Sequence, residues 1–187
     1  MMRFIRSAVV MLAGLAVATG MRAADTYKLD PAHTSVGFSI THLVISEVNG
    51  RFNEVAGEVT LDSDALTAAK ATIPVKSVDT GIGKRDDHLR GADFFDAEKF
   101  PTITFESTKV EKSQIAGKFT MHGVTKEITM PFVLKGPIKD PWGNTRLAVT
   151  AEITINRTDY GMKSMTGVGD EVRIKIVAEA TKAEDKK

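Results

Sequence analysis

The chain has 187 residues and no cysteine, and this absence excludes several kinds of chemistry. Disulfide frameworks, thiolate metal sites, covalent haem attachment and cysteine nucleophiles all require that residue. A lipid-modified N-terminus of the lipoprotein type needs a cysteine after the apolar leader, so it is excluded as well. A folded domain of this chain must therefore depend on its own apolar core, for which the length is sufficient.

Charge of one sign is not in excess. The 25 lysines and arginines nearly balance 24 acidic residues, and no basic cluster occurs. Residues 1–24 hold three arginines and no acidic residue, so the remainder has 22 basic and 24 acidic residues, a formal charge of −2. Nucleic acids and anionic surfaces attract basic patches, so we expect no nucleic-acid partner.

Only one long apolar run is present, at Ser7–Ala18, and it is too short to span a bilayer as a helix. Arg3 and Arg6 precede it, as is typical of a secretory signal peptide. We predict that residues 1–24 are a signal peptide that is removed on export, so that the mature chain begins near Asp25. Small residues at the end of the run offer an earlier cleavage site, and an uncleaved N-terminal anchor is the alternative.

A regular β pattern occupies the C-terminal half. Apolar Phe119 and Met121, for example, alternate with Lys118 and Thr120. Successive side chains of a strand point to opposite faces, so such a segment has one apolar and one polar face. Several antiparallel strands of this kind can bury their apolar faces only in a sandwich or a closed barrel. The segments with this alternation are 102–106, 115–122, 128–135, 147–156 and 172–179.

The N-terminal half shows the same pattern less cleanly. Asp30-Pro31 interrupts the first strand, Asn49-Gly50 predicts a turn, and Pro74 suggests an edge or a bulge. Asp62–Lys70 is interpreted as a loop with one helical turn. The strands expected in this half are 27–29, 36–44, 55–61 and 71–78.

Residues Thr80–Pro101 lack alternation, and Asp86–Arg90 before Gly91 predicts a short helix that ends at the glycine. We therefore predict an all-β fold. Residues 25–181 should form one lipocalin-like antiparallel barrel of about eight strands with a short helical insertion, followed by a charged tail at 182–187. A filled β-sandwich is the alternative.

No motif for catalysis or metal binding stands out. Thr80–Arg85 resembles a phosphate-binding loop, but Val78 stands where its first glycine belongs and Arg85 replaces the Ser or Thr. Ser35 near His33 lacks the Gly-x-Ser-x-Gly turn of a nucleophile. The histidines show neither His-x-His nor His-Glu-x-x-His spacing, so we predict no metal site, no cofactor and no catalytic residue. These histidines are His33, His42, His88 and His122.

The apolar face of the strands is the remaining candidate for a binding site. A barrel of about eight strands can enclose one small ligand, and Gly57, Gly117 and Ala151 on that face are predicted to leave space. An ordinary filled core is the alternative. The predicted cavity residues are Phe38, Val59, Ile73, Phe105, Phe119, Met121, Met130, Phe132, Val149, Ile153, Ile174 and Ile176.

Nine short stretches, spread over most of the chain, carry a family resemblance. They are 30–38 (DPAHTSVGF), 40–43 (ITHL), 50–52 (GRF), 77–80 (SVDT), 84–90 (KRDDHLR), 93–101 (DFFDAEKFP), 117–125 (GKFTMHGVT), 156–161 (NRTDYG) and 168–172 (VGDEV). Together they resemble the YceI-like family. The resemblance implies a lipocalin-like barrel, a periplasmic location and a long polyisoprenoid-type lipid or isoprenoid quinone as ligand. It supplies no catalytic residues.

Within that resemblance, Arg85, Asp86 and His88 could gate the barrel mouth or orient a lipid headgroup. Alternatively, Arg85 and Asp86 only fasten the helical loop to the barrel. Three hypotheses follow: a periplasmic lipid carrier, a filled-barrel interaction or stress-response module without ligand, and an enzyme that uses Asp86 and His88. The carrier hypothesis allows transient contact with a membrane or a membrane protein, and a homodimer.

Overall fold

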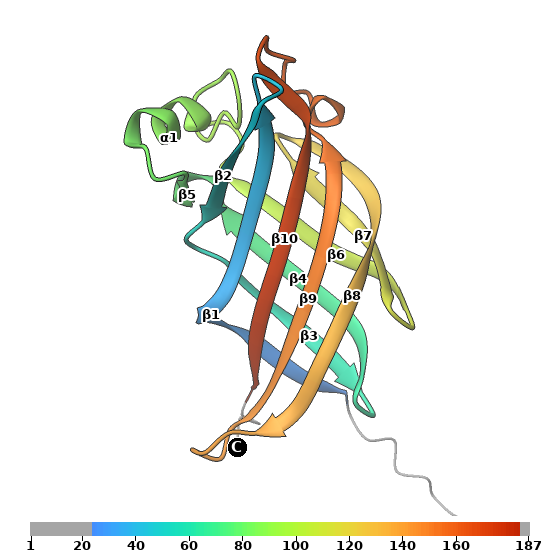
Figure 1. Cartoon of the computed structure of the whole chain (residues 1–187). Coiled ribbons are helices and arrows are strands. Elements are labelled where there is room, and N and C mark those ends of the chain that lie inside the picture. Colours follow the sequence, from blue (N-terminus) through green and yellow to red (C-terminus); the bar gives the residue numbers. More distant parts are fainter. Residues whose placement is uncertain (1–23, 184–187) are drawn as a thin grey trace, which may run out of the picture.

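Eight strands close into an antiparallel barrel in the computed structural model, which describes residues 24–183 (Figure 1). A helix, α1 (Gly83–Arg90), lies beside one end of the barrel, and short 3-10 turns occur at Val75–Ser77 and Arg157–Tyr160. The strands are β1 (Asp25–His42), β2 (Ser46–Phe52), β3 (Ala56–Asp62), β4 (Ala65–Pro74), β5 (Val78–Asp79), β6 (Thr102–Glu111), β7 (Gln114–Met121), β8 (Val124–Lys139), β9 (Thr145–Asn156) and β10 (Val168–Lys182).

The pairing of β1 with β10 closes the barrel. The strand order is β10-β9-β8-β7-β6-β4-β3-β1, and β1 returns to β10 along almost its whole length. The other edge of β1 pairs first with β3, over Asp25–Lys28, and then with β2, over residues 36–42. Because the sheet closes on itself, the predicted barrel is confirmed and the sandwich alternative is wrong.

The alternation predicts the facing of the C-terminal strands correctly. In β7, Ile115, Phe119 and Met121 are buried whereas Lys118 is exposed. The buried residues form two adjoining clusters that share several partly buried neighbours inside the barrel. The period of two therefore separates the interior of the barrel from its outer surface.

Two turns in the N-terminal half differ from the prediction. The chain turns at residues 43–45, and Asn49-Gly50 lies inside β2, where these residues pair with Ser39 and Phe38. Gly50 serves a close approach, because a Cβ there would overlap the Phe38 ring. The predicted loop at Asp62–Lys70 is also wrong: β3 and β4 are joined by a tight turn at residues 63–64, and Ala68 already pairs with Thr60.

The first strand is longer than predicted. Asp30-Pro31 does not end it, because β1 continues with an irregularity in its register between Leu29 and Thr34. Such a bulge accommodates the proline without loss of the strand. The helix is confirmed, although it begins at Gly83 and therefore earlier than expected.

Both ends of the chain extend beyond the described part. The predicted signal peptide, residues 1–24, lies outside it except for its last residue, as do residues 184–187 of the predicted tail. Strand β10 continues through Lys182, which pairs with Tyr27. Among the described residues, no helix is long and apolar enough to cross a membrane.

Candidate ligand cavity

A cavity of about 450 Å³ lies inside the barrel. All eight barrel strands contribute to its wall, together with β2, α1 and the segment that follows α1. Its volume falls within the range of about 300–1,000 Å³ that is usual for small-molecule sites, and such sites are mostly apolar. The interior is therefore not a completely filled core.

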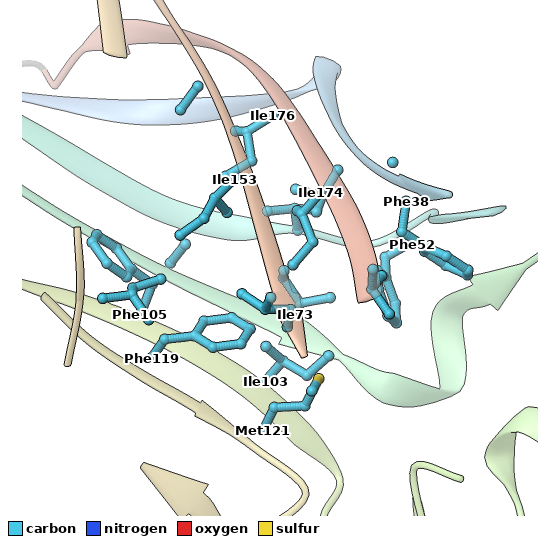
Figure 2. Close-up of a pocket in the computed structure, with 18 of the residues that line it drawn as sticks. Phe38, Phe52, Ile73, Ile103, Phe105, Phe119, Met121, Ile153, Ile174 and Ile176 are labelled. Atoms are coloured by element: carbon cyan, nitrogen blue, oxygen red, sulfur yellow. The ribbon is translucent and has the colours of Figure 1, made fainter. Parts of the chain in front are cut away.

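The structure places all twelve predicted cavity residues on this wall. Figure 2 shows the side chains from opposite strands directed toward a common space, with Phe105 and Phe119 facing Ile153, Ile174 and Ile176. They come from β6, β7, β9 and β10. The twelve are Phe38, Val59, Ile73, Phe105, Phe119, Met121, Met130, Phe132, Val149, Ile153, Ile174 and Ile176.

The prediction that Gly57 and Gly117 leave space in the cavity is wrong. Neither Gly57 nor Gly117 lines the cavity. A Cβ at Gly57 would overlap the carbonyl of Lys70 on β4, and one at Gly117 would lie 2.5 Å from the carbonyl oxygen of Glu106 and 2.7 Å from the Phe105 ring. These glycines permit close packing of backbone and aromatic ring instead of leaving space. Ala151 does line the cavity.

One end of the barrel is closed by side chains. Tyr27, Leu61, Leu147 and Ala180 are almost completely buried there, next to the cavity but outside its lining. At the α1 end the lining includes His42 and His88, both of them exposed residues. The α1 end is therefore the mouth of the cavity.

Aromatic rings connect the helical insertion to the mouth. Phe38 and Phe52 approach with ring centroids 5.8 Å apart, and Phe95, from the segment after α1, packs edge-on against Phe52 at the same distance. All three line the cavity. Edge-to-face and tilted ring contacts of this kind stabilise the packing beyond simple burial, so the insertion forms part of the cavity wall.

The predicted mouth residues have different positions. Asp86 is buried and does not line the cavity; its Oδ1 accepts hydrogen bonds from the backbone N–H and the hydroxyl of Thr80, at 2.8 and 2.5 Å. Arg85 donates from Nε to the Thr80 hydroxyl and from Nη2 to the Thr80 carbonyl, at 2.7 and 2.9 Å, and it lines the cavity. Asp86 thus fastens α1, whereas Arg85 fastens the helix and also faces the mouth.

His88 lies at the mouth, where it contacts Phe94 and Asp93. Its ring packs edge-on against Phe94 with centroids 5.0 Å apart, and Nε2 lies 3.6 Å from a carboxylate oxygen of Asp93. The carboxylate of Asp86 is occupied by Thr80. The two residues named in the enzyme hypothesis therefore do not face the cavity together.

Arg157 is a cavity residue to which the sequence analysis assigned no role. Only 2% of its side chain is exposed, and Nη2 lies 2.9 Å from Asp170 while Nε donates to the Gly169 carbonyl at 2.9 Å. A buried guanidinium must be paired in this way, because an isolated buried charge is very costly. These three residues lie in the stretches 156–161 and 168–172, which resemble the family. The resemblance was therefore the one feature of the sequence that pointed to them.

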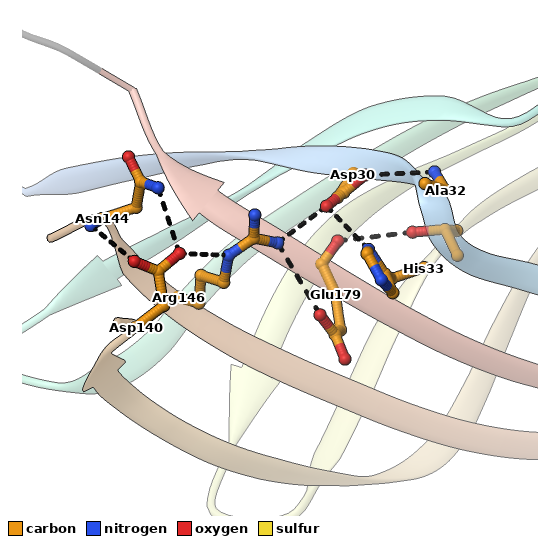
Figure 3. A network of polar contacts seen from close by, with 8 residues as sticks. Asp30, Ala32, His33, Asp140, Asn144, Arg146 and Glu179 are labelled. Carbon is orange, nitrogen blue, oxygen red and sulfur yellow. Dashed lines mark hydrogen bonds and ion pairs between the residues drawn. The ribbon is translucent and has the colours of Figure 1, made fainter. Parts of the chain in front are cut away.

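A second polar group lies on the barrel near its closed end (Figure 3). Ligand-type atoms of Asp30, His33 and Glu179 lie within 4.8 Å of one another. Arg146 already occupies this cluster, since its Nη1 is 2.7 Å from Asp30 and 3.8 Å from Glu179. A cation would have to displace this guanidinium, so the geometry describes an ion-pair network and not a metal centre.

Arg146 also determines the electrostatics of its neighbours. Its hydrogen bond, followed by that of His33, lowers the pKa of Asp30 to about 2. Burial raises the pKa of Asp140, but hydrogen bonds from Arg146, Asn144 and the backbone of Trp142 outweigh it and hold this pKa at about 2. Both carboxylates are therefore ionised at neutral pH and link β1, β9 and the turn before β9.

These features define the chain as a closed lipocalin-like barrel with an apolar internal cavity that opens beside a helical insertion. The family model of the YceI-like domain matches residues 27–180, and the chain belongs to this family. Among relatives, a UPF0312 protein of Vibrio vulnificus (strain YJ016) is 36% identical over 177 residues, which cover 90% of this chain and 93% of that protein.

Solved structures share the fold. Burkholderia cenocepacia BcnA superposes with a TM-score of 0.72 at 24% identity, covering 82% of this chain and 99% of BcnA. A polyisoprenoid binding domain from Saccharophagus degradans superposes with a TM-score of 0.68 at 17% identity, covering 84% of this chain and 98% of that domain. At these identities the likeness shows the architecture.

Proposed function

We propose that the protein is a periplasmic carrier that holds a long-chain polyisoprenoid-type lipid or an isoprenoid quinone in the barrel. The observation that carries this proposal is the apolar cavity with one closed end and one mouth. Burial of each methylene group contributes about 0.8 kcal/mol, so apolar walls retain a prenyl chain without specific polar contacts. The polyisoprenoid-binding domain of similar fold supports the same class of ligand.

The cavity wall offers a place for the chain of the lipid, and the mouth offers one for its polar head. Thr80 accepts hydrogen bonds from two of the five N–H donors of Arg85, a residue that lines the cavity. We assign the twelve apolar wall residues to the chain, and Arg85 with His88 to the headgroup. Arg85→Gln should therefore weaken lipid retention, whereas Arg51→Gln, outside the cavity, should not.

Extraction tests the carrier proposal. Protein purified from the periplasm is extracted with organic solvent, and the extract is analysed by mass spectrometry. A prenyl lipid or quinone near one molecule per barrel is the expected result. Its absence from protein that remains folded, also after incubation with prenyl lipids, would leave the ligand-free interaction module in place of the carrier.

The location needs its own test, because it depends on residues outside the described part. The intact mass of protein from the periplasmic fraction should correspond to a start between Thr19 and Asp25. A full-length mass in the membrane fraction would contradict both the signal peptide and the periplasmic assignment.

No catalytic step forms part of the proposal. The Asp86 carboxylate accepts hydrogen bonds from Thr80, and the carboxylate that His88 contacts is that of the exposed Asp93. His88→Ala should therefore lower lipid content no more than Arg85→Gln does, and neither the parent nor the variant should turn over a bound prenyl lipid.

A further inference from the structure

The turn between β1 and β2 presents three consecutive large apolar residues to solvent. Leu43, Val44 and Ile45 are 56%, 92% and 84% exposed. Leu43 and Val44 have positive φ values of 49° and 65°, which are unfavourable for ordinary side chains and especially for a β-branched valine. Exposed apolar surface and unfavourable backbone geometry both lower stability, so this turn calls for a role outside the fold.

The turn stands at the mouth of the cavity (Figure 1). The backbone N–H of Leu43 donates to the Gly167 carbonyl at 2.7 Å, which ties the turn to the segment before β10. His42, immediately before the turn, and Met165, close to Gly167, both line the cavity. The exposed apolar tip and the cavity opening therefore belong to one end of the molecule.

We infer that this tip inserts into the surface of a lipid bilayer and so places the cavity mouth against the hydrocarbon. A stable protein interface needs about 800 Å² and some 20–30 residues from each partner, far more than a protruding turn of three residues provides. A bilayer accepts apolar side chains without a complementary shape. The transfer of lipid between the bilayer and the cavity rests on the proposed function. Docking to the bilayer does not require a lipid in the barrel.

The chemistry of the turn suits shallow insertion. The N–H of Ile45 donates to the His42 carbonyl at 3.2 Å and that of Leu43 is also bonded, which reduces the cost of moving this backbone out of water. Exposed Ser46 follows the tip directly, which limits the apolar surface to a few ångströms of depth. Ile82, 53% exposed, directly precedes α1, the helix that borders the mouth, and adds apolar surface there.

Apolar insertion predicts a particular salt and lipid dependence. The chain without residues 1–24 has a formal charge of −2, so attraction to anionic lipid is not the driving force. Binding should be similar for vesicles of phosphatidylcholine alone and for vesicles that also contain phosphatidylglycerol, and it should persist at high salt. Binding only to the anionic vesicles, abolished by salt, would overturn the inference.

Fluorescence at single sites tests the orientation. Because the chain has no cysteine, Val44→Cys and Trp142→Cys each carry one thiol for an environment-sensitive probe. Trp142 is the matched control, since it is 81% exposed in the turn before β9, at the opposite end of the barrel. Vesicles should shift the emission of the probe at position 44 to shorter wavelength and leave position 142 unchanged. No shift at 44, or equal shifts at both positions, would contradict bilayer docking through the tip.

Unlabelled variants give a second measurement. Val44→Ser with Ile45→Ser should reduce vesicle binding in a flotation assay by about tenfold or more, because two exposed apolar side chains are lost from the contact. Ile138→Ser with Trp142→Ser removes comparable apolar surface from the other end and should leave binding unchanged. If the tip variant floats like the parent, the inference fails.

Extraction of these same proteins keeps the two ideas separate. Prenyl lipid in the barrel without vesicle binding would remove the docking surface and leave the carrier intact. Vesicle binding through the tip by protein without prenyl lipid would support the docking surface and contradict the carrier proposal. A probe at position 44 that is shielded by a periplasmic protein, but not by vesicles, would assign the tip to a protein partner and overturn the inference.

Discussion

Phe119 lies at the boundary between packed core and open cavity. Its ring packs edge-on against the buried Tyr160 with centroids 5.4 Å apart, and the same side chain lines the cavity. Neighbouring Lys118 is exposed on the outer face of β7. A larger side chain at position 119 therefore either occupies cavity volume, which reduces lipid binding, or overlaps packed atoms, which lowers stability.

Phe119→Trp should reduce the amount of co-purified lipid several-fold while the melting temperature stays close to that of the parent, because the larger ring occupies cavity volume. In a fully packed core the same enlargement would cost about 1–3 kcal/mol. Lys118→Ala should change neither lipid content nor melting temperature. A destabilised Phe119→Trp protein, with no lipid in any of the three, would favour the filled barrel over the carrier.

Arg146 and its carboxylates predict how stability depends on pH. The pKa values of Asp30 and Asp140 are about 2 in the folded chain, below the ordinary value of 3.8. Carboxyl groups with a lowered folded pKa stabilise the native state above their unfolded pKa, and this stabilisation is lost as pH falls from about 4 toward 2. Arg146→Gln should therefore lower the melting temperature at pH 7 and flatten its dependence on pH between about 4 and 2.

Arg173→Gln is a suitable control for that experiment. Arg173 pairs with Glu47 at 3.0 Å, but both side chains are about half exposed, and such surface pairs contribute little. The control should keep the parental dependence of melting temperature on pH. Identical acid profiles for Arg146→Gln and the parent would show that the network at the closed end does not govern acid stability.

At the level of elements, α1 is held to the barrel by polar contacts made around one short segment. Asp86 accepts two hydrogen bonds from Thr80, and Arg90 donates to the carbonyls of Lys76 and Val78 at 3.0 and 2.9 Å. Leu89 is the one apolar residue of the helix that packs against the core, and it is only partly buried, so the polar contacts hold the element that borders the mouth. Loss of one of them should loosen α1 before it affects the barrel.

Asp86→Ala should raise the hydrogen-exchange rate of residues 80–95 and speed release of bound lipid, at a cost of about 1–3 kcal/mol for the unpaired donors of Thr80. Asp86→Asn keeps an acceptor oxygen and should behave more like the parent. Lys84→Ala, which removes an exposed side chain from the same helix, is the control. Uniform faster exchange throughout the barrel strands would contradict a local clamp.

Some strands and turns could be predicted from the sequence and others could not. The facing of β7 and β9 could be predicted because each strand has one apolar face, and this signal is local. The turn at residues 43–45 could not, because three apolar residues carry no turn signal, whereas Asn49-Gly50 carries a strong one and lies in a strand. Pairing with β1 and the approach of the Phe38 ring override that local preference in β2.

For the site, too, local patterns could be predicted from the sequence, whereas contacts between distant residues could not. Alternation identified twelve apolar residues of the cavity lining, since facing is a property of each strand alone, but it missed others, such as Phe52, Phe94 and Phe95. The meeting of His33 with Glu179 depends on the register of β1 against β10, and that of Arg157 with Asp170 depends on the turn between β9 and β10. Neither contact leaves a spacing motif in the chain.

For the whole molecule, the cavity inside the barrel has a mechanical consequence. Hydrostatic pressure favours the state of smaller volume, and unfolding eliminates internal voids, with volume changes of about −20 to −100 mL/mol in ordinary proteins. A barrel that encloses a cavity of about 450 Å³ should be unusually sensitive to compression when that space is empty. Delipidated protein should therefore unfold at lower pressure than protein that carries its ligand, as followed by NMR. Equal unfolding pressures before and after extraction would mean that the extracted material had not filled the barrel, so compression can measure occupancy before the cargo has been identified.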